Sequence, residues 1–253
     1  MANRRIPFAL LVLCGAGCHS AAPERSANYD MEVCVPPDTV VLAGFHLDRL
    51  RGTDSYGHLP PDWKAALEPL LSATYLMLAY NGRDLLVIAR GHFSPAPPGA
   101  VLLTPELALA GSPEAVRAAG GQRATGKPGA ASLLARAAAI EIRDIWAVAG
   151  GGASLPFTGN IANLNRLLRF SDYATVAATV SSSMQLDAAA FCATVEAARQ
   201  LEETLRGLIS LAAGAMRDRD LAMLIQSAQL RRDDSTVHVA LTATLPALDK
   251  LLR

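Results

Sequence analysis

The sequence has little of several features that would assign it to a functional class. Its 253 residues include only four cysteines, two tryptophans and 5% aromatic residues in total. Four cysteines are too few for a disulfide-rich scaffold, and so few aromatics argue against a stacking platform for bases or glycans. The 23 basic residues are balanced by 23 acidic ones, which excludes the basic surface of a general nucleic-acid binder. We therefore expect no nucleic-acid partner.

Long apolar runs are also missing. No stretch approaches the ~20 apolar residues that an internal membrane-spanning helix requires. Hydrophobic residues nevertheless make up 51% of the chain, which is too many for a disordered protein. The composition indicates a globular protein with enough chain to bury a sizeable core.

Motifs for catalysis, metal binding and nucleotide binding are missing as well. There is no H-E-x-x-H zinc motif, and the stretch 152–156 (GASLP) lacks the final glycine of a G-x-S-x-G nucleophile elbow. The glycines at 150–152 and Gly159 are not followed by the Lys-Ser/Thr pair of a P-loop. We therefore expect no cofactor and no bound metal, and the catalytic residues, if the protein is an enzyme, are unknown from sequence.

An enzyme with a dispersed site remains an alternative. His46 and Asp48 are two residues apart, and His92 is a third candidate. This hypothesis requires the fold to bring these side chains into one concave pocket with perturbed pKa values.

The most specific positive signal is at the N-terminus. Arg4 and Arg5 precede the short apolar run 6–13, and the small residues 15–17 lead to Cys18. A charged start, a short apolar middle and small residues before a cleavage point are typical of a secretory signal peptide. Because the small residues end on a cysteine, the segment resembles a bacterial lipoprotein signal. The resemblance implies cleavage before Cys18 and acylation of that residue, for example with palmitate.

This resemblance implies a lipid-anchored protein of the cell envelope, on the outer-membrane or periplasmic side. Two or more acyl chains hold a protein stably on a membrane, at ~0.8 kcal/mol per buried CH2. The interpretation makes residues 1–17 a signal peptide and residues 18–35 a lipid anchor and flexible tether. The alternative is ordinary cleavage after Ala22, which would release an unanchored protein.

Two cysteines remain after the signal, Cys34 and Cys192. In an oxidising envelope compartment they can form a disulfide that ties the start of the chain to its second half. Alternatively, both are buried thiols that act as small hydrophobic side chains. The sequence leaves both options open.

Hydrophobic periodicity predicts short strands in hairpins, interrupted by helices. Asn81-Gly82 lies between two apolar runs and predicts a tight hairpin. Ser112 and Thr194 each precede a helical segment with an acid in its first turn. Together these features predict an α+β fold with helices packed on a mostly antiparallel sheet.

The two halves of the sequence share a pattern. Residues 47–50 (LDRL) are followed by Tyr56, and residues 164–167 (LNRL) are followed by Tyr173 at the same spacing. We infer an internal duplication in which each unit runs strand, helix, antiparallel hairpin, helix. The predicted divisions are a first unit over 36–120, a linker with a short helix over 121–143, and a second unit over 144–253.

These observations favour an exported, lipid-anchored envelope protein with a non-catalytic binding or assembly role. The partner would be an envelope protein or peptide, docked along an exposed sheet edge. The alternatives are a hydrolase-like envelope enzyme with a dispersed site and a purely structural tethered domain.

Overall fold

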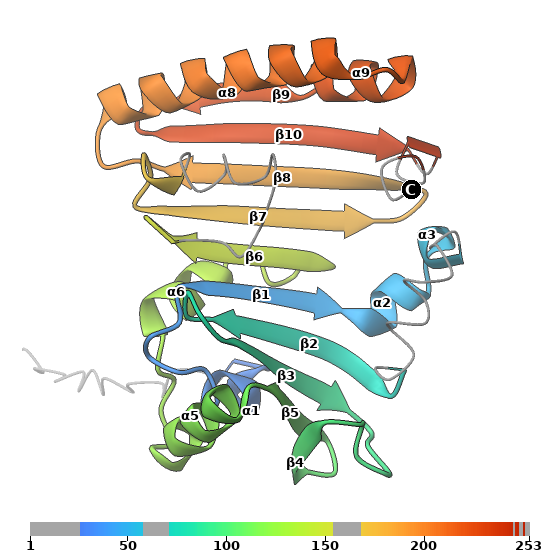
Figure 1. The fold of residues 1–253 in the computed structure, drawn as a ribbon, viewed down its shortest axis with the longest axis vertical. Helices are drawn as coiled ribbons and strands as arrows, with labels where there is room; N and C mark the ends of the chain where they lie inside the picture. The colour runs from blue at the N-terminus through green and yellow to red at the C-terminus, as the bar shows by residue number, and fades with distance from the viewer. Residues whose placement is uncertain (1–25, 58–70, 154–167, 245, 248–249, 251–253) are drawn as a thin grey trace, which may run out of the picture.

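The structure is a computed structural model that describes residues 26–57, 71–153, 168–244, 246–247 and 250. Ten strands form one antiparallel sheet with helices packed against it (Figure 1), which confirms the predicted α+β fold. The strands are β1 (Val41–His46), β2 (Ala73–Tyr80), β3 (Leu85–Gly91), β4 (Ala100–Thr104), β5 (Leu107–Gly111), β6 (Ile145–Gly150), β7 (Tyr173–Val180), β8 (Ser183–Phe191), β9 (Gln229–Asp233) and β10 (Thr236–Thr244). The helices are α1 (Tyr29–Glu32), α2 (Leu47–Arg51), α3 (Asp54–Gly57), α5 (Pro113–Ala124), α6 (Ala131–Ala137), α8 (Val195–Ala215) and α9 (Arg219–Gln226).

The strand order is symmetric about the centre of the sheet. It reads β4-β5-β3-β2-β1-β6-β7-β8-β10-β9, with β1 and β6 as antiparallel neighbours in the middle. From this centre each half proceeds outward in the same way, through two further consecutive strands and then a hairpin whose second strand lies inside the first. The two predicted units are therefore the two halves of one continuous sheet.

The helices do not follow the same symmetry. Ser112 and Thr194 do cap helices as predicted, since each side-chain oxygen accepts a backbone N–H at 3.1 Å, from Ala115 and Ala197 respectively. However, α5 follows β5, whereas α8 follows β8. The two helix starts that look alike in sequence thus occupy different places in the fold. The repeated quartet at 164–167 lies outside the described residues.

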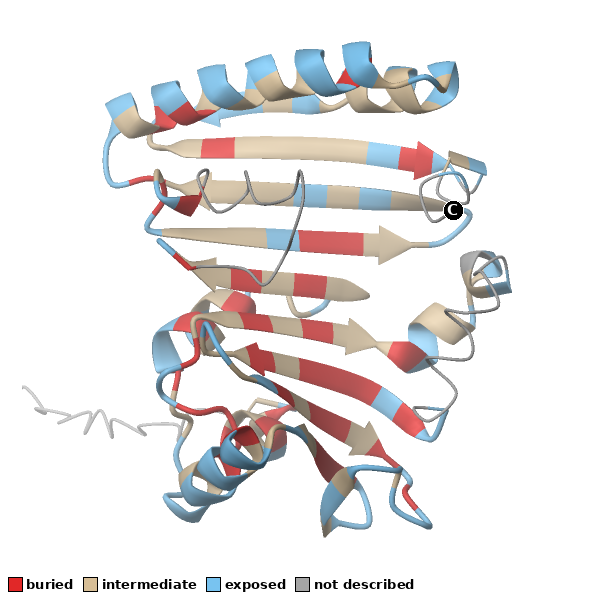
Figure 2. Cartoon of the chain, viewed as in Figure 1, coloured by how far each residue is buried: buried red, intermediate tan, exposed pale blue. Residues whose placement is uncertain are grey.

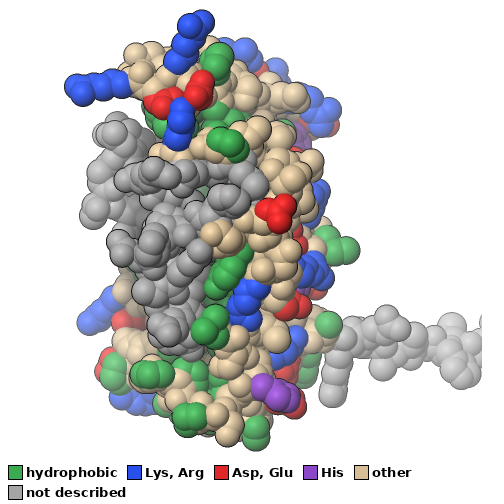
Figure 3. Space-filling model, turned by 90° about the vertical axis from the view of Figure 1, so that its right-hand side faces the viewer, with side chains coloured by type: hydrophobic (Ala, Val, Ile, Leu, Met, Phe, Trp, Pro, Cys, Tyr) green, Lys and Arg blue, Asp and Glu red, His purple; other side chains and the backbone are tan. Residues whose placement is uncertain are grey.

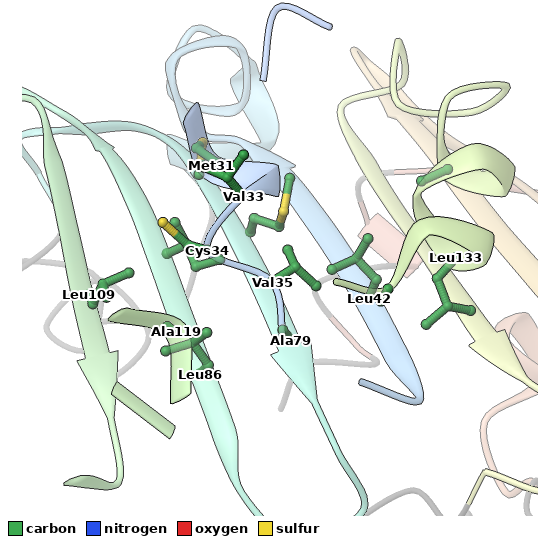
Figure 4. Close-up of a cluster of buried hydrophobic side chains, with 14 of the residues drawn as sticks. Met31, Val33, Cys34, Val35, Leu42, Ala79, Leu86, Leu109, Ala119 and Leu133 are labelled. Atoms are coloured by element: carbon green, nitrogen blue, oxygen red, sulfur yellow. The ribbon is translucent and has the colours of Figure 1, made fainter. Parts of the chain in front are cut away.

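The N-terminal part of the fold begins earlier than predicted. Met31, Cys34 and Val35 are fully buried and pack with Leu42 of β1 and Leu133 of α6 (Figure 4). The predicted tether, 18–35, is therefore wrong for residues 26–35, which are part of the core. The small polar residues before Met31 led to the prediction of a tether, although apolar core residues follow them directly.

The predicted linker also belongs to the fold. Gly120 and Gly121 lie inside α5, which runs to Ala124, although glycine costs a helix ~1 kcal/mol relative to alanine. Beyond α5, Leu133 and Ala137 of α6 are buried in the same core as β1 and β6. Burial of Ala119 and of the α6 residues offsets the poor helix propensity of the glycines.

The side chains of the seven inner strands divide between two faces that differ in chemistry. The strand registers define one face that we call the apolar face. The Tyr80 hydroxyl is the one polar side-chain group among the following members of this face. These members are Leu85, Val87, Ala89, Leu76, Leu78, Tyr80, Val41, Ala43, Phe45, Ile145, Ala147, Ala149, Ala174, Val176, Ala178, Leu186, Ala188, Ala190, Val237, Val239 and Leu241. We call the other side the opposite face.

The opposite face changes character along the sheet. Over β1, β2, β3 and β6 it carries the main core, covered by α1, α5 and α6. Over β7, β8 and β10 it carries polar residues such as Thr179, Asp187 and His238. Buried residues are accordingly concentrated in β1, β2, β3 and β5, whereas partly exposed residues dominate β7, β8 and β10 (Figure 2). Along β7, β8 and β10, packing is thus concentrated on the apolar face.

Candidate functional site: an apolar cavity

A cavity of about 590 Å³ lies over the apolar face. It is lined from seven strands and from Leu201 and Leu205 of α8. No lining residue among those described is charged, and the only ones with a polar side-chain atom are Tyr80, Ser171 and Thr175. The Ser171 hydroxyl already donates to the Leu168 carbonyl at 3.1 Å. The cavity therefore offers almost nothing to a polar ligand and a large apolar surface to a hydrophobic one.

Alanine creates the empty space. The strand floor contains six alanines of the apolar face, whose side chains extend by a single carbon: Ala43, Ala147, Ala149, Ala174, Ala188 and Ala190. Beneath the covering helices the same face carries larger residues, such as Leu76 near α2 and Val237 near α8. The lining also includes larger side chains, such as Phe45, Leu78 and Val237.

Val176 is a residue of this floor that stays partly exposed. It lies on β7, well inside a ten-stranded sheet, yet its side chain remains 38% exposed. A β-branched apolar residue at such a position normally packs against a covering layer. Contiguous apolar surface that is left accessible is typical of a binding site.

The two ends of the cavity are built differently. At one end Leu201 of α8 is almost fully buried against Cys192, Ala198 and Val237. At the other end Tyr80 and Leu85 close the cavity where β2 turns into β3. The cavity thus spans both halves of the sheet and crosses the β1–β6 junction.

Charges of α8 lie away from the cavity. Arg199 pairs with Glu196 and Glu203, and its hydrogen bonds lower the pKa of Glu196 to about 2. Glu202 accepts hydrogen bonds from Arg206 and Arg232, which lower its pKa and tie α8 to β9. In side view, charged side chains occur at the top of the molecule, along its right edge and at its lower left, and hydrophobic side chains are visible on its middle and lower parts (Figure 3).

The residues suggested for a dispersed catalytic site do not come together. Asp48 and His92 are exposed. His46 lies on the opposite face, where its Nε2 is 3.0 Å from the Glu141 carbonyl oxygen and its ring lies against Tyr75. No hydrogen bond or ion pair joins any two of these three described residues. They therefore form no acid–base constellation.

The two cysteines lie in different parts of the core. Cys34 belongs to the cluster formed by α1, α5 and the first strands, and Cys192 belongs to the cluster beneath α8. Both are free, buried thiols, and burial raises the pKa of each. This arrangement matches the interpretation of both as small hydrophobic side chains. Cys18 lies outside the described residues.

Other site types have no support in the described part of the chain. Its His, Cys, Asp and Glu side chains form no group of three that could hold a metal ion. None of its helices is both long and apolar enough to cross a membrane. In the turn that follows β6, Gly152 adopts a positive φ of 73°.

The two edges of the sheet differ. The β9 edge carries Arg231, Arg232 and Asp233, and charges of this kind discourage the addition of another strand. The β4 edge has no charged residue and exposes Val101 and Leu102. The docking of a partner on a sheet edge stays a prediction, and of the two edges we expect β4 to be the one used.

Sequence reasoning missed the cavity. The sequence feature that could have indicated it is the alternation of alanine in β6, β7 and β8. Alanine is a poor strand former, and its short side chain fills little of the space above a sheet. In the pattern 174–178 (ATVAA), the alternation correctly placed Val176 on an apolar side. It could not show that Val176 stays 38% exposed in the fold.

Comparisons with known proteins bear on the fold. No family model matches the chain, and no curated protein matches it either. Among solved structures, crystal form III of TP0453 is similar over 87% of this chain and 96% of that one, with a TM-score of 0.55 and 10% identity. Crystal form I of TP0453 gives a TM-score of 0.45 and 8% identity. At this level of identity, the first similarity shows that the two chains share a fold.

Proposed function

We propose that this protein is an exported, lipid-anchored component of the cell envelope that holds an apolar ligand in the cavity over its sheet. One observation carries the proposal: a space of about 590 Å³ whose described lining has no charge and only three polar side chains. Ligand sites typically measure about 300–1,000 Å³ and are mostly apolar. The signal-like residues before Cys18 support the envelope location.

The energetics favour occupation. Each methylene removed from water contributes about 0.8 kcal/mol, and an empty space of this size leaves its lining without van der Waals partners. A non-catalytic role fits the same lining, because none of its described side chains is an acid, a base or an activated nucleophile. A charged or hydrogen-bonding headgroup would have to remain outside.

A palmitate titration tests the binding role. Ala188→Phe places a ring on the floor of the cavity, and Ala240→Phe is the matched control on the opposite face of neighbouring strand β10. We expect the wild-type chain and the control to bind palmitate equally, and Ala188→Phe to bind at least tenfold more weakly, because the ring displaces about two methylenes or more at about fourfold each. Equal affinity in all three proteins, or no binding to any of them, would contradict the proposal.

Intact-mass analysis tests the envelope role. The full chain recovered from the membrane fraction should carry acyl mass on Cys18, and Cys18→Ser should abolish both the added mass and the membrane association. An unmodified N-terminus at Pro23 would instead identify ordinary cleavage after Ala22 and overturn the lipid anchor.

A further inference from the structure

We infer that the ligand is a single unbranched hydrocarbon chain that lies across the strands, so that the cavity measures chain length. This inference rests on the proposed binding function and specifies its ligand class. It follows from the shape of the cavity, whereas the proposed function follows from its apolarity.

The cavity is long in the direction perpendicular to the strands. Its lining comes from β3, β2, β1, β6, β7, β8 and β10, which are seven consecutive neighbours in the sheet. Strands lie about 4.8 Å apart, so the six intervals between these seven strands span roughly 29 Å.

The volume of the cavity sets how many hydrocarbon chains it can hold over this length. The apolar-face residues that line it are at most three per strand, for example Val41, Ala43 and Phe45 on β1, and successive same-face residues are about 6.7 Å apart. Spreading 590 Å³ over the 29 Å length gives a cross-section of roughly 20 Å², which a single file of carbons in van der Waals contact fills. The volume therefore matches one hydrocarbon chain over the length of the floor.

The length suggests which chains fit. Carbon–carbon bonds of about 1.5 Å at tetrahedral angles advance an extended chain by roughly 1.25 Å per carbon. A fully extended chain of about 20 carbons therefore lies within the floor. The alanines allow the chain to lie flat, because each side chain rises by one carbon only.

Ala147 divides this path in two. It lies on β6, the fourth of the seven lining strands, and pairs directly with Ala43 of β1 and Val176 of β7. A phenylalanine at this position would block the path halfway and leave roughly 14 Å on either side. Only a short chain fits within that distance.

The test is a length series on the full chain. Octanoate, laurate, palmitate and arachidate are titrated against the wild type, Ala147→Phe and the opposite-face control Ala240→Phe. For the wild type and the control we expect affinity to rise about fourfold per added methylene through the whole series, up to arachidate. For Ala147→Phe we expect octanoate to bind as before, and laurate and longer acids to gain nothing further. Ala147→Leu, a smaller obstruction, should shift the plateau less, and thermal melts confirm that each variant is folded.

The outcomes separate the two proposals. If the acids bind but Ala147→Phe weakens every length by the same factor, the chain does not lie across the strands, and the inference is overturned while the binding function stands. Tighter binding of a sterol than of palmitate would overturn it in the same way. If no apolar probe binds at all, the proposed function itself fails.

Discussion

The indole Nε1 of Trp146 donates a hydrogen bond to the hydroxyl oxygen of Tyr75 at 3.0 Å, across the backbone of β1. Trp146 is on β6 and Tyr75 on β2, and both side chains are buried. Between them lies Gly44, whose missing side chain leaves room for the two rings. This contact joins the two halves of the sheet on the opposite face, directly behind the middle of the cavity floor.

Gly44→Ala should destabilise the protein strongly. A Cβ at Gly44 would overlap the Trp146 ring and the Tyr75 hydroxyl, and overpacking of this kind costs about 1–3 kcal/mol. Urea denaturation measures the loss. The control is Gly207→Ala on α8, where an added Cβ meets no atom within 4 Å and should be neutral or stabilise by about 0.5–1 kcal/mol. A Gly44→Ala protein as stable as this control would refute the packing argument.

Tyr75→Phe should leave the Trp146 N–H buried without an acceptor, at a cost of about 1–3 kcal/mol. Burial raises the pKa of Tyr75 far above its ordinary value. The pKa of Tyr75 is higher in the folded protein than in the unfolded one. The neutral Tyr75 hydroxyl therefore contributes its full stabilisation below the unfolded pKa of tyrosine, and this contribution is lost as the pH rises toward the folded pKa. An alkaline titration of tyrosinate absorbance should show one more tyrosine ionising in the unfolded wild type than in the folded wild type. Tyr75→Phe should remove that difference, and a difference that persists would assign it to another tyrosine.

Cys34 and Cys192 should react slowly in the folded protein. Burial raises the pKa of both thiols, and the thiolate is the reactive form. The substitutions Cys14→Ser and Cys18→Ser leave Cys34 and Cys192 as the remaining cysteines. Near neutral pH a thiol reagent should then modify almost no thiol in the folded protein and two thiols after denaturant is added. If no thiol reacts in denaturant without a reductant, the two cysteines form a disulfide.

Arg90 should hold the N-terminal segment on the sheet. Its guanidinium donates to the Asn28 side-chain oxygen and the Ala27 carbonyl, each at 3.0 Å, and pairs with the Asp30 carboxylate. Arg90→Lys keeps the charge but loses the forked geometry, so amide exchange over residues 27–35 should accelerate by about tenfold or more. Exchange in β2 should stay unchanged.

The matched control for this measurement is Arg83→Lys, at an exposed position in the turn between β2 and β3. It should leave exchange over residues 27–35 at the wild-type rate. Equal effects of the two substitutions, or uniform acceleration throughout the chain, would mean that Arg90 supports global stability and does not act as a local clamp.

Local patterns in the sequence were enough to predict several elements of this fold. The hairpin around Asn81-Gly82 and the caps at Ser112 and Thr194 depend on contacts between residues close in sequence, and the structure has all of them. The α5 extension through Gly120 and Gly121 could not be predicted, because it depends on packing against distant strands. The core role of Met31 to Val35 depends on tertiary contacts in the same way.

The cavity could not be predicted from local sequence patterns, for a related reason. Apolar alternation in β6, β7 and β8 predicts a face turned away from water, and that face exists. How closely this face is covered depends on tertiary contacts, and among the described helices α8 reaches it with Leu201 and Leu205 while Val176 stays 38% exposed. A cavity is a property of the distance between layers, and no spacing along the chain encodes that distance directly.

The most direct test of the central claim is to locate a bound chain. The full-length protein carrying Cys18→Ser is co-crystallised with palmitate that bears bromine on its terminal carbon, and the bromine is located by anomalous scattering. The account predicts a single peak over the apolar face, in contact with lining residues such as Val176 or Ala147, and continuous chain density across the strands. Bromine bound elsewhere on the protein, or an apolar face closed over by its own side chains, would contradict it.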